Sequence, residues 1–81
     1  MSYSTENHDE LDLLLLYNSS NSQEGIKIHK TADPSVIAAA QRLFKNGFIT
    51  QPDGGYLTPL GSEAAEFAQS LFTMLNVPGE E

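Results

Sequence analysis

The chain has 81 residues with 40% hydrophobic content, which allows one small globular domain, and its formal net charge is −7 at pH 7. No apolar run approaches the roughly 20 residues that a membrane-spanning helix needs. Because the sequence contains no cysteine, disulfide bonds, thiolate nucleophiles and cysteine-bound zinc are excluded.

The first segment predicts a helix that is apolar on two sides. Asn7 and Glu10 have the spacing of a capping box, and the acidic residues around them suit the positive end of a helix dipole. An almost unbroken apolar run follows over residues 11–17, in which Leu13 and Leu16 point away from the face formed by the other leucines. Such a helix needs cover on both sides, either from the other helices of the domain or from a second copy of the chain.

A short strand is expected after a polar loop over residues 18–25. Residues 26–29 alternate apolar and polar side chains, which is the period-2 pattern of a half-buried strand. A short helix over residues 23–30 is the alternative, and Gly25 together with two β-branched residues argues against it. We expect the strand to pair with a hairpin further along the chain.

A second helix is predicted over residues 34–46. Asp33 is a good N-cap whose carboxylate can accept backbone N–H groups, and Pro34 is favoured at the first helical position. Gly47 supplies a C-terminal stop, after which Phe48 can fold back onto the last turn as in a Schellman cap. The apolar face comprises Val36, Ile37, Ala40, Leu43 and Phe44, and the polar face comprises Ser35, Ala38, Gln41, Arg42 and Lys45.

The remaining segment predicts a hairpin and a third helix. Two β-prone runs, residues 48–50 and 56–58, flank a strong turn signal over residues 51–55. Thr58 then caps the helix that Pro59 opens. The apolar stripe of this helix comprises Leu60, Ala64, Phe67, Ala68, Leu71 and Leu75, and Phe72 and Met74 widen it where a partner could bind.

The order helix, strand, helix, hairpin, helix resembles the winged-helix superfamily. The resemblance lies in residues 43–49, where the helix ends before the wing, and in residues 54–61, a strand that runs into a helix with glycine in its first turn. We therefore expect a single compact winged-helix-like α+β domain over residues 1–81, with three helices, a small antiparallel sheet and flexible ends at 1–6 and 77–81. The whole chain also resembles a small uncharacterised family of bacterial proteins of about this size.

The winged-helix resemblance implies a DNA-binding, regulator-like protein, working as a homodimer. The helix over residues 34–46 would enter the major groove, where its polar side chains would contact base edges and phosphates. The four basic residues of the chain all lie between residues 25 and 50, an uneven distribution in an acidic protein. DNA contacts are accordingly expected at Ser35, Gln41, Arg42, Lys45, Lys27 and Lys30.

The alternative is a protein-interaction module on the same scaffold. The net charge of −7, the acidic wing tip at Asp53 and the doubly apolar first helix favour it. A protein partner or a second copy of the chain would then contact Leu13, Leu16, Phe72 and Met74. Surface potential separates the two hypotheses, because a continuous positive patch favours DNA whereas acidic residues that interrupt it favour a protein partner.

Catalysis has no support in the sequence. The serines lack a nucleophile-elbow context, the two histidines are far apart, and His8 with Asp12 forms a single i, i+4 pair. A chain of this length also has little volume for a ligand cleft. We expect a non-enzymatic protein with no cofactor, no metal site, no small-molecule substrate and no membrane contact. Its N-terminus lacks the features of a secretory signal, which favours a cytoplasmic location.

Overall fold

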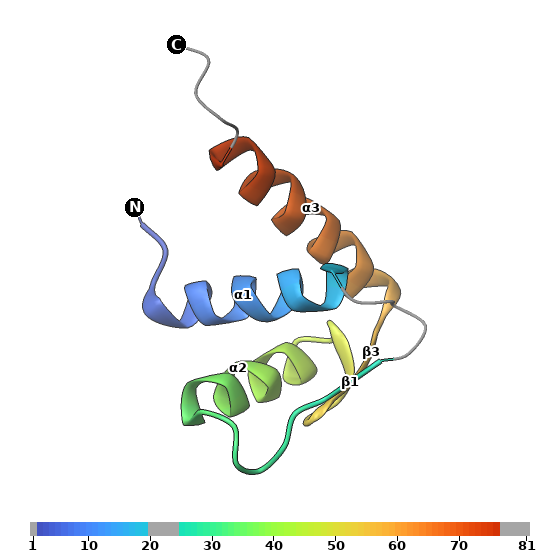
Figure 1. Ribbon diagram of the computed structural model, residues 1–81. Helices are drawn as coiled ribbons and strands as arrows, with labels where there is room; N and C mark the ends of the chain where they lie inside the picture. The colour runs from blue at the N-terminus through green and yellow to red at the C-terminus, as the bar shows by residue number, and fades with distance from the viewer. Residues whose placement is uncertain (1, 20–24, 77–81) are drawn as a thin grey trace.

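The computed structural model of the chain describes residues 2–19 and 25–76. The elements follow in the order α1 (Thr5–Ser19), β1 (Ile26–Lys27), α2 (Pro34–Lys45), β2 (Ile49–Gln51), β3 (Gly54–Leu57) and α3 (Pro59–Leu75). Figure 1 shows α1 between α2 and α3, with the strands gathered at one end of the helices. The expected α+β class, with three helices and a small antiparallel sheet in a winged-helix-like arrangement, is confirmed.

The sheet has the order β1-β3-β2, and both pairings are antiparallel. The strand expected at residues 26–29 is therefore present over Ile26–Lys27, and it pairs with the hairpin as predicted. The predicted turn over residues 51–55 is too long, because Gly54 already pairs with Lys27. A Cβ atom at Gly54 would collide with the carbonyl oxygen of Ile26, so glycine permits this close approach of β1 to β3.

The first helix begins earlier than the sequence pattern indicated. Its cap is a reciprocal pair in which the Asn7 amide donates to Ser4 Oγ at 3.0 Å and the Ser4 amide donates to Asn7 Oδ1 at 3.2 Å. The predicted capping box at Asn7 and Glu10 thus lies three residues too late. Thr5 and Glu6, which we expected in a flexible end, belong to α1. The other predicted flexible end, residues 77–81, lies outside the described residues.

The C-terminal end of α2 is capped as predicted, whereas the side-chain cap predicted at its N-terminal end is not formed. The backbone carbonyl of Asp33 accepts the amides of Val36 and Ile37, whereas its carboxylate makes no capping hydrogen bond. At the other end the Phe48 amide donates to the Leu43 carbonyl at 2.9 Å, and the Gly47 amide donates to the Phe44 carbonyl at 3.0 Å. These two bonds form the expected Schellman motif, which turns the chain directly from α2 into β2.

The core lies where α1 packs against both other helices. Leu13 and Leu14 are adjacent in sequence and both buried, so both sides of α1 pack within the chain, as the first of the two alternatives predicted, although Leu16, one turn after Leu13, is 48% exposed. On α2 the buried face includes Ala39, whereas Phe44, expected in the core, is 42% exposed. Small side chains at Ala39 and Ala40 let α1 and α2 approach closely. The buried set comprises Leu13, Leu14, Tyr17, Ala39, Ala40, Leu43, Ile49, Ala65 and Ala68.

The buried face of α3 differs from the predicted one. It is made of small residues at i, i+4 and i+7, namely Gly61, Ala65 and Ala68. A Cβ atom at Gly61 would collide with the carbonyl oxygen of Phe48, so the helix lies against the backbone that enters β2. Thr58 fixes this approach, because its Oγ1 accepts the Gly61 amide at 3.0 Å and donates to the Gly47 carbonyl at 2.6 Å. Large apolar residues expected in the core are consequently exposed, namely Leu60 (50%), Phe67 (67%) and Leu75 (74%).

Candidate functional site

The four basic residues do not form one positive patch. Arg42 and Lys27 each contact a carboxylate, whereas Lys30 and Lys45 are exposed. Ser35 and Gln41, the other expected DNA contacts, are also exposed on α2. Acidic residues therefore interrupt the basic cluster that the sequence suggested, at Glu10 and at Asp53.

Arg42 turns toward α1 and away from solvent. Its Nε donates to Glu10 Oε2 at 2.6 Å and its Nη2 donates to the Glu6 carbonyl at 3.3 Å. The hydrogen bond to Glu10 raises the pKa of Arg42. The side chain consequently joins α2 to the first turns of α1, and a guanidinium held this way is not directed toward a base edge.

Lys27 is engaged within the sheet. Its Nζ lies 3.0 Å from Asp53 Oδ2, and this contact lowers the pKa of Asp53. The Ile28 amide also donates to the Asp53 carbonyl at 2.7 Å, so the wing tip and the end of β1 are joined by side chain and backbone. Both side chains of the ion pair are well exposed, and its contribution to stability is small.

The ion pair between Arg42 and Glu10 should stabilise the fold. Arg42→Ala is expected to lower the urea midpoint of unfolding, because it leaves the half-buried Glu10 without its charged partner. Lys45→Ala removes the same charge from the same helix at an exposed position, so it should leave the midpoint nearly unchanged. Urea unfolding followed by circular dichroism makes the comparison. Equal effects of the two variants would contradict a structural role for Arg42.

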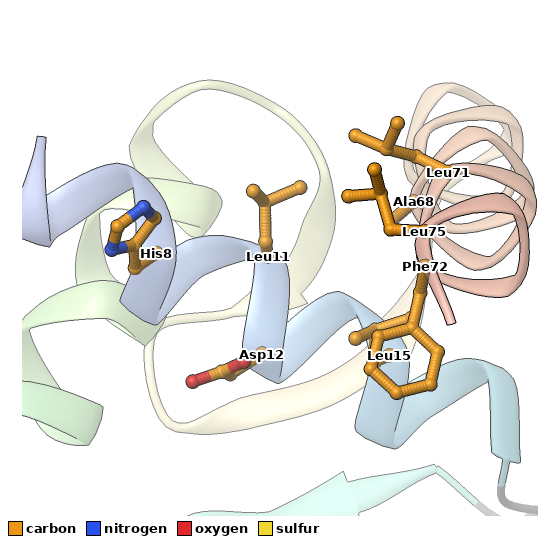
Figure 2. A pocket seen from close by; sticks show the side chains of 8 residues that line it. All are labelled: His8, Leu11, Asp12, Leu15, Ala68, Leu71, Phe72 and Leu75. Carbon is orange, nitrogen blue, oxygen red and sulfur yellow. The ribbon is translucent and has the colours of Figure 1, made fainter. Parts of the chain in front are cut away.

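An apolar groove opens between α1 and α3. It has a volume of about 150 Å³, and its lining comprises His8, Leu11, Asp12, Leu15, Ala68, Leu71, Phe72 and Leu75. Figure 2 shows α1 and α3 contributing facing side chains, with Leu11 and Leu15 opposite Leu71 and Phe72. The lining positions follow the i, i+3, i+4, i+7 spacing on each helix, so each helix presents one face to the groove.

The two helices that line the groove lie close together at one end and diverge at the other. At the C-terminal end of α1, Asn18 Nδ2 donates to Gln69 Oε1 at 3.3 Å and ties the two helices together. From there α3 runs away from α1, so that the N-terminal end of α1 and the C-terminal end of α3 are separated (Figure 1). The centroid of the Tyr3 ring lies 6.3 Å from that of the His8 ring, so an exposed aromatic residue lies beside a groove residue near the N-terminal end of α1.

The expected partner contacts divide between core and surface. Leu13 does not fit this role, because it is 4% exposed and packs in the core cluster. Phe72 is half exposed and lines the groove, and Met74 is 72% exposed on the same helix. Leu16 is 48% exposed and lines a separate hollow between α1 and α2, with Asp9, Asp12, Leu13 and Val36.

The sequence pattern does not predict most of the groove, because it assigns Leu71 and Leu75 to the core stripe of the third helix. A signal was present, because Gly61, Ala65 and Ala68 form a face of small residues that suits close helix packing. Recognising that face as the buried one would have left the neighbouring leucines on the surface. Leu11 and Leu15 are likewise only partly buried.

Residues 2–19 and 25–76 contain neither a cluster of metal ligands nor a membrane-spanning helix. Across the part of the chain that the structure describes, no three His, Asp or Glu side chains gather where they could hold a metal ion. His8 and Asp12 both line the groove, without a third ligand of this kind beside them among those residues. Within residues 2–19 and 25–76, none of the helices combines the length and apolar character that crossing a bilayer requires.

Comparison with known proteins places the whole fold in one family. A family model described as a family of unknown function, DUF5669, matches residues 1–76. No curated protein and no solved structure matches the chain. The match includes all six elements of the fold and both helices of the groove. The chain therefore belongs to the family of unknown function DUF5669.

Proposed function

We propose that the chain is a non-enzymatic protein-interaction module that binds its partner in the groove between α1 and α3. The observation that carries this proposal is the exposure of large apolar side chains on α3 beside an apolar groove. Phe67, Phe72, Met74 and Leu75 are between 49% and 74% exposed. Contiguous exposed apolar surface of this kind marks interaction sites in soluble proteins.

The charges support a protein partner over DNA. DNA binding depends on cations that neutralise phosphates. Of the four in this chain, Arg42 and Lys27 contact carboxylates, and the chain as a whole carries −7. Neither α1 nor α3 contains Lys or Arg, so the groove itself would repel a polyanion.

A peptide selection with matched surface variants tests the proposal. Helical peptides displayed on phage are selected on the immobilised chain, and the affinities of the selected peptides are measured for Phe72→Ser and Tyr56→Ser. Both aromatic side chains are 49% exposed, but Tyr56 lies on β3 outside the groove. We expect Phe72→Ser to weaken binding at least about tenfold, as for an interface anchor, and Tyr56→Ser to leave it unchanged.

Two results would contradict this proposal. One is a selection that yields no peptide above background with a folded sample. The other is a set of peptides that bind wild type and Phe72→Ser equally well, which would place binding elsewhere. Circular dichroism of each variant provides the control for folding.

DNA binding is the second candidate, and a hollow beside α2 favours it. Lys30 and Gln41 line this hollow together, and Lys45 is exposed on the same helix as Gln41. Asp53 also lines it, which places a carboxylate next to the two polar groups. Binding to mixed-sequence duplex DNA at low salt, lost in Lys30→Ala/Lys45→Ala, would support this candidate. Absence of binding at low salt would remove it.

A further inference from the structure

We infer that the occupant of the groove is an amphipathic helix with basic residues along one flank of its apolar face. The inference rests on the proposed function and adds the chemistry of the partner. It follows from the position of the groove, which the facing sides of α1 and α3 line, next to the carboxylates of Asp9 and Asp12 on α1.

The shape of the groove suits a third helix. Four lining positions on α1 and four on α3 share the i, i+3, i+4, i+7 spacing, so the groove is bounded by two straight rows of side chains. An amphipathic helix places its own apolar residues at the same spacing, and this is a common mode of peptide recognition. The volume of about 150 Å³ is below the roughly 300 Å³ at which small-molecule pockets begin. Individual apolar side chains fit the space better than a cofactor does.

The charged residues beside the groove determine which residues should flank the apolar face of the partner helix. Asp12 lines the groove and also lines the neighbouring hollow between α1 and α2, where Asp9 lies beside it. These two carboxylates therefore form a crest along α1 at one edge of the groove. No lysine or arginine opposes them on α1 or α3, since neither helix contains one. Arg42 of α2 attracts Asp9, but its guanidinium is bonded to Glu10. Lysine or arginine on the partner would meet this crest and add electrostatic attraction to the apolar contacts.

A second copy of the chain is a poorer occupant. Docking the same two helices of another copy into the groove would bring together acidic residues without a cation from either side. Juxtaposed like charges disfavour such a contact. The remaining exposed cations, Lys30 and Lys45, lie on other elements, outside the groove.

The test uses three synthetic peptides that share one apolar face. Each has Leu and Phe at i, i+3, i+4 and i+7, and the polar flank carries Lys in the first, Gln in the second and Glu in the third. Fluorescence anisotropy measures binding of each labelled peptide to the full chain at low and high salt. We expect the Lys peptide to bind about tenfold more tightly than the Gln peptide at low salt, with a smaller difference at high salt.

Two double variants remove the same charge from different places. Asp9→Asn/Asp12→Asn should weaken binding of the Lys peptide several-fold and reduce its salt dependence. Glu63→Gln/Glu66→Gln should not, because both residues are exposed and lie on the side of α3 opposite its groove positions. A comparable loss in the two double variants would overturn the inference, since net charge alone would then explain the preference.

The remaining outcomes separate this inference from the proposed function. If the Gln or Glu peptide binds as tightly as the Lys peptide and Phe72→Ser abolishes binding, the groove is an interaction site, but the inference that its partner has a basic flank is wrong. If no peptide binds, both ideas fail. Analytical ultracentrifugation covers the case of a second copy, because a dimer that Phe72→Ser dissociates would assign the groove to self-association and overturn the inference.

Discussion

Gly61→Ala is expected to lower the free energy of unfolding by about 3 kcal/mol. A glycine within a helix normally favours the opposite result, because alanine has the better helix propensity by about 1 kcal/mol. Here the added Cβ would meet the carbonyl oxygen of Phe48, which is backbone and cannot rotate away. Separating α3 from β2 would also strain the Thr58 hydroxyl, which bonds the Gly61 amide and the Gly47 carbonyl.

Urea unfolding of Gly61→Ala beside Ser62→Ala measures this effect. Ser62 is the next residue of α3 and is exposed, so its replacement with alanine should change stability by no more than about 0.5 kcal/mol. If Gly61→Ala were as stable as wild type or more stable, α3 would not pack against the start of β2 as described. The small-residue face would then not explain why the large apolar residues are exposed.

Tyr17→Phe is expected to stabilise the fold by about 1 kcal/mol at neutral pH. Tyr17 is 2% exposed, and within the described residues its hydroxyl has no hydrogen-bond partner. Phenylalanine keeps the ring and lacks the hydroxyl, so the folded state no longer carries the unfavourable free energy of burying an unpaired polar group. Thermal or urea unfolding of the two proteins compares them, and a clear loss of stability would show that the hydroxyl is bonded.

The same residue predicts a decline in stability at alkaline pH. Burial, with the charge of Asp53 as a second cause, raises the pKa of Tyr17 from 10.0 to about 12. Between these values the unfolded chain binds fewer protons than the folded chain, so rising pH favours unfolding. Wild type should therefore lose stability from about pH 10 to pH 12 more steeply than Tyr17→Phe does. Parallel pH profiles would contradict the raised pKa.

Local signals in the sequence predicted much of the fold. The Schellman motif at Gly47 and Phe48 and the cap at Thr58 each depend on residues within a stretch of six, and both are present. The apolar character of the first helix on two sides also indicated its central position. Caps of this kind can be predicted from the sequence because their hydrogen bonds join residues that are close together in the chain.

Contacts between distant residues could not be read in this way. Arg42 lies on the polar face of its helix by periodicity, yet it bonds Glu10, 32 residues away in the sequence. The direction of α3 relative to α1 likewise determines which leucines line the groove, and periodicity gives only the face and not its neighbour. The predicted core stripe of α3 was wrong, because the size of the side chains determines the buried face more than their hydrophobicity does. Gly61 lets α3 lie against the backbone at Phe48, and a side chain as large as that of Leu60 would prevent this contact.

The anchoring of α3 at one end has a consequence for the energetics of binding. Its buried residues end at Ala68, and residues 72–76 are exposed, so the last turns are held mainly by their own backbone hydrogen bonds. Fraying of these turns would dismantle one wall of the groove, and a partner would have to restore it. Affinity should then depend on helix propensity at solvent-facing positions such as Ser70, which no partner in the groove touches. Substitutions outside the interface would thus change the affinity, because they alter how much conformational entropy α3 loses when the partner binds.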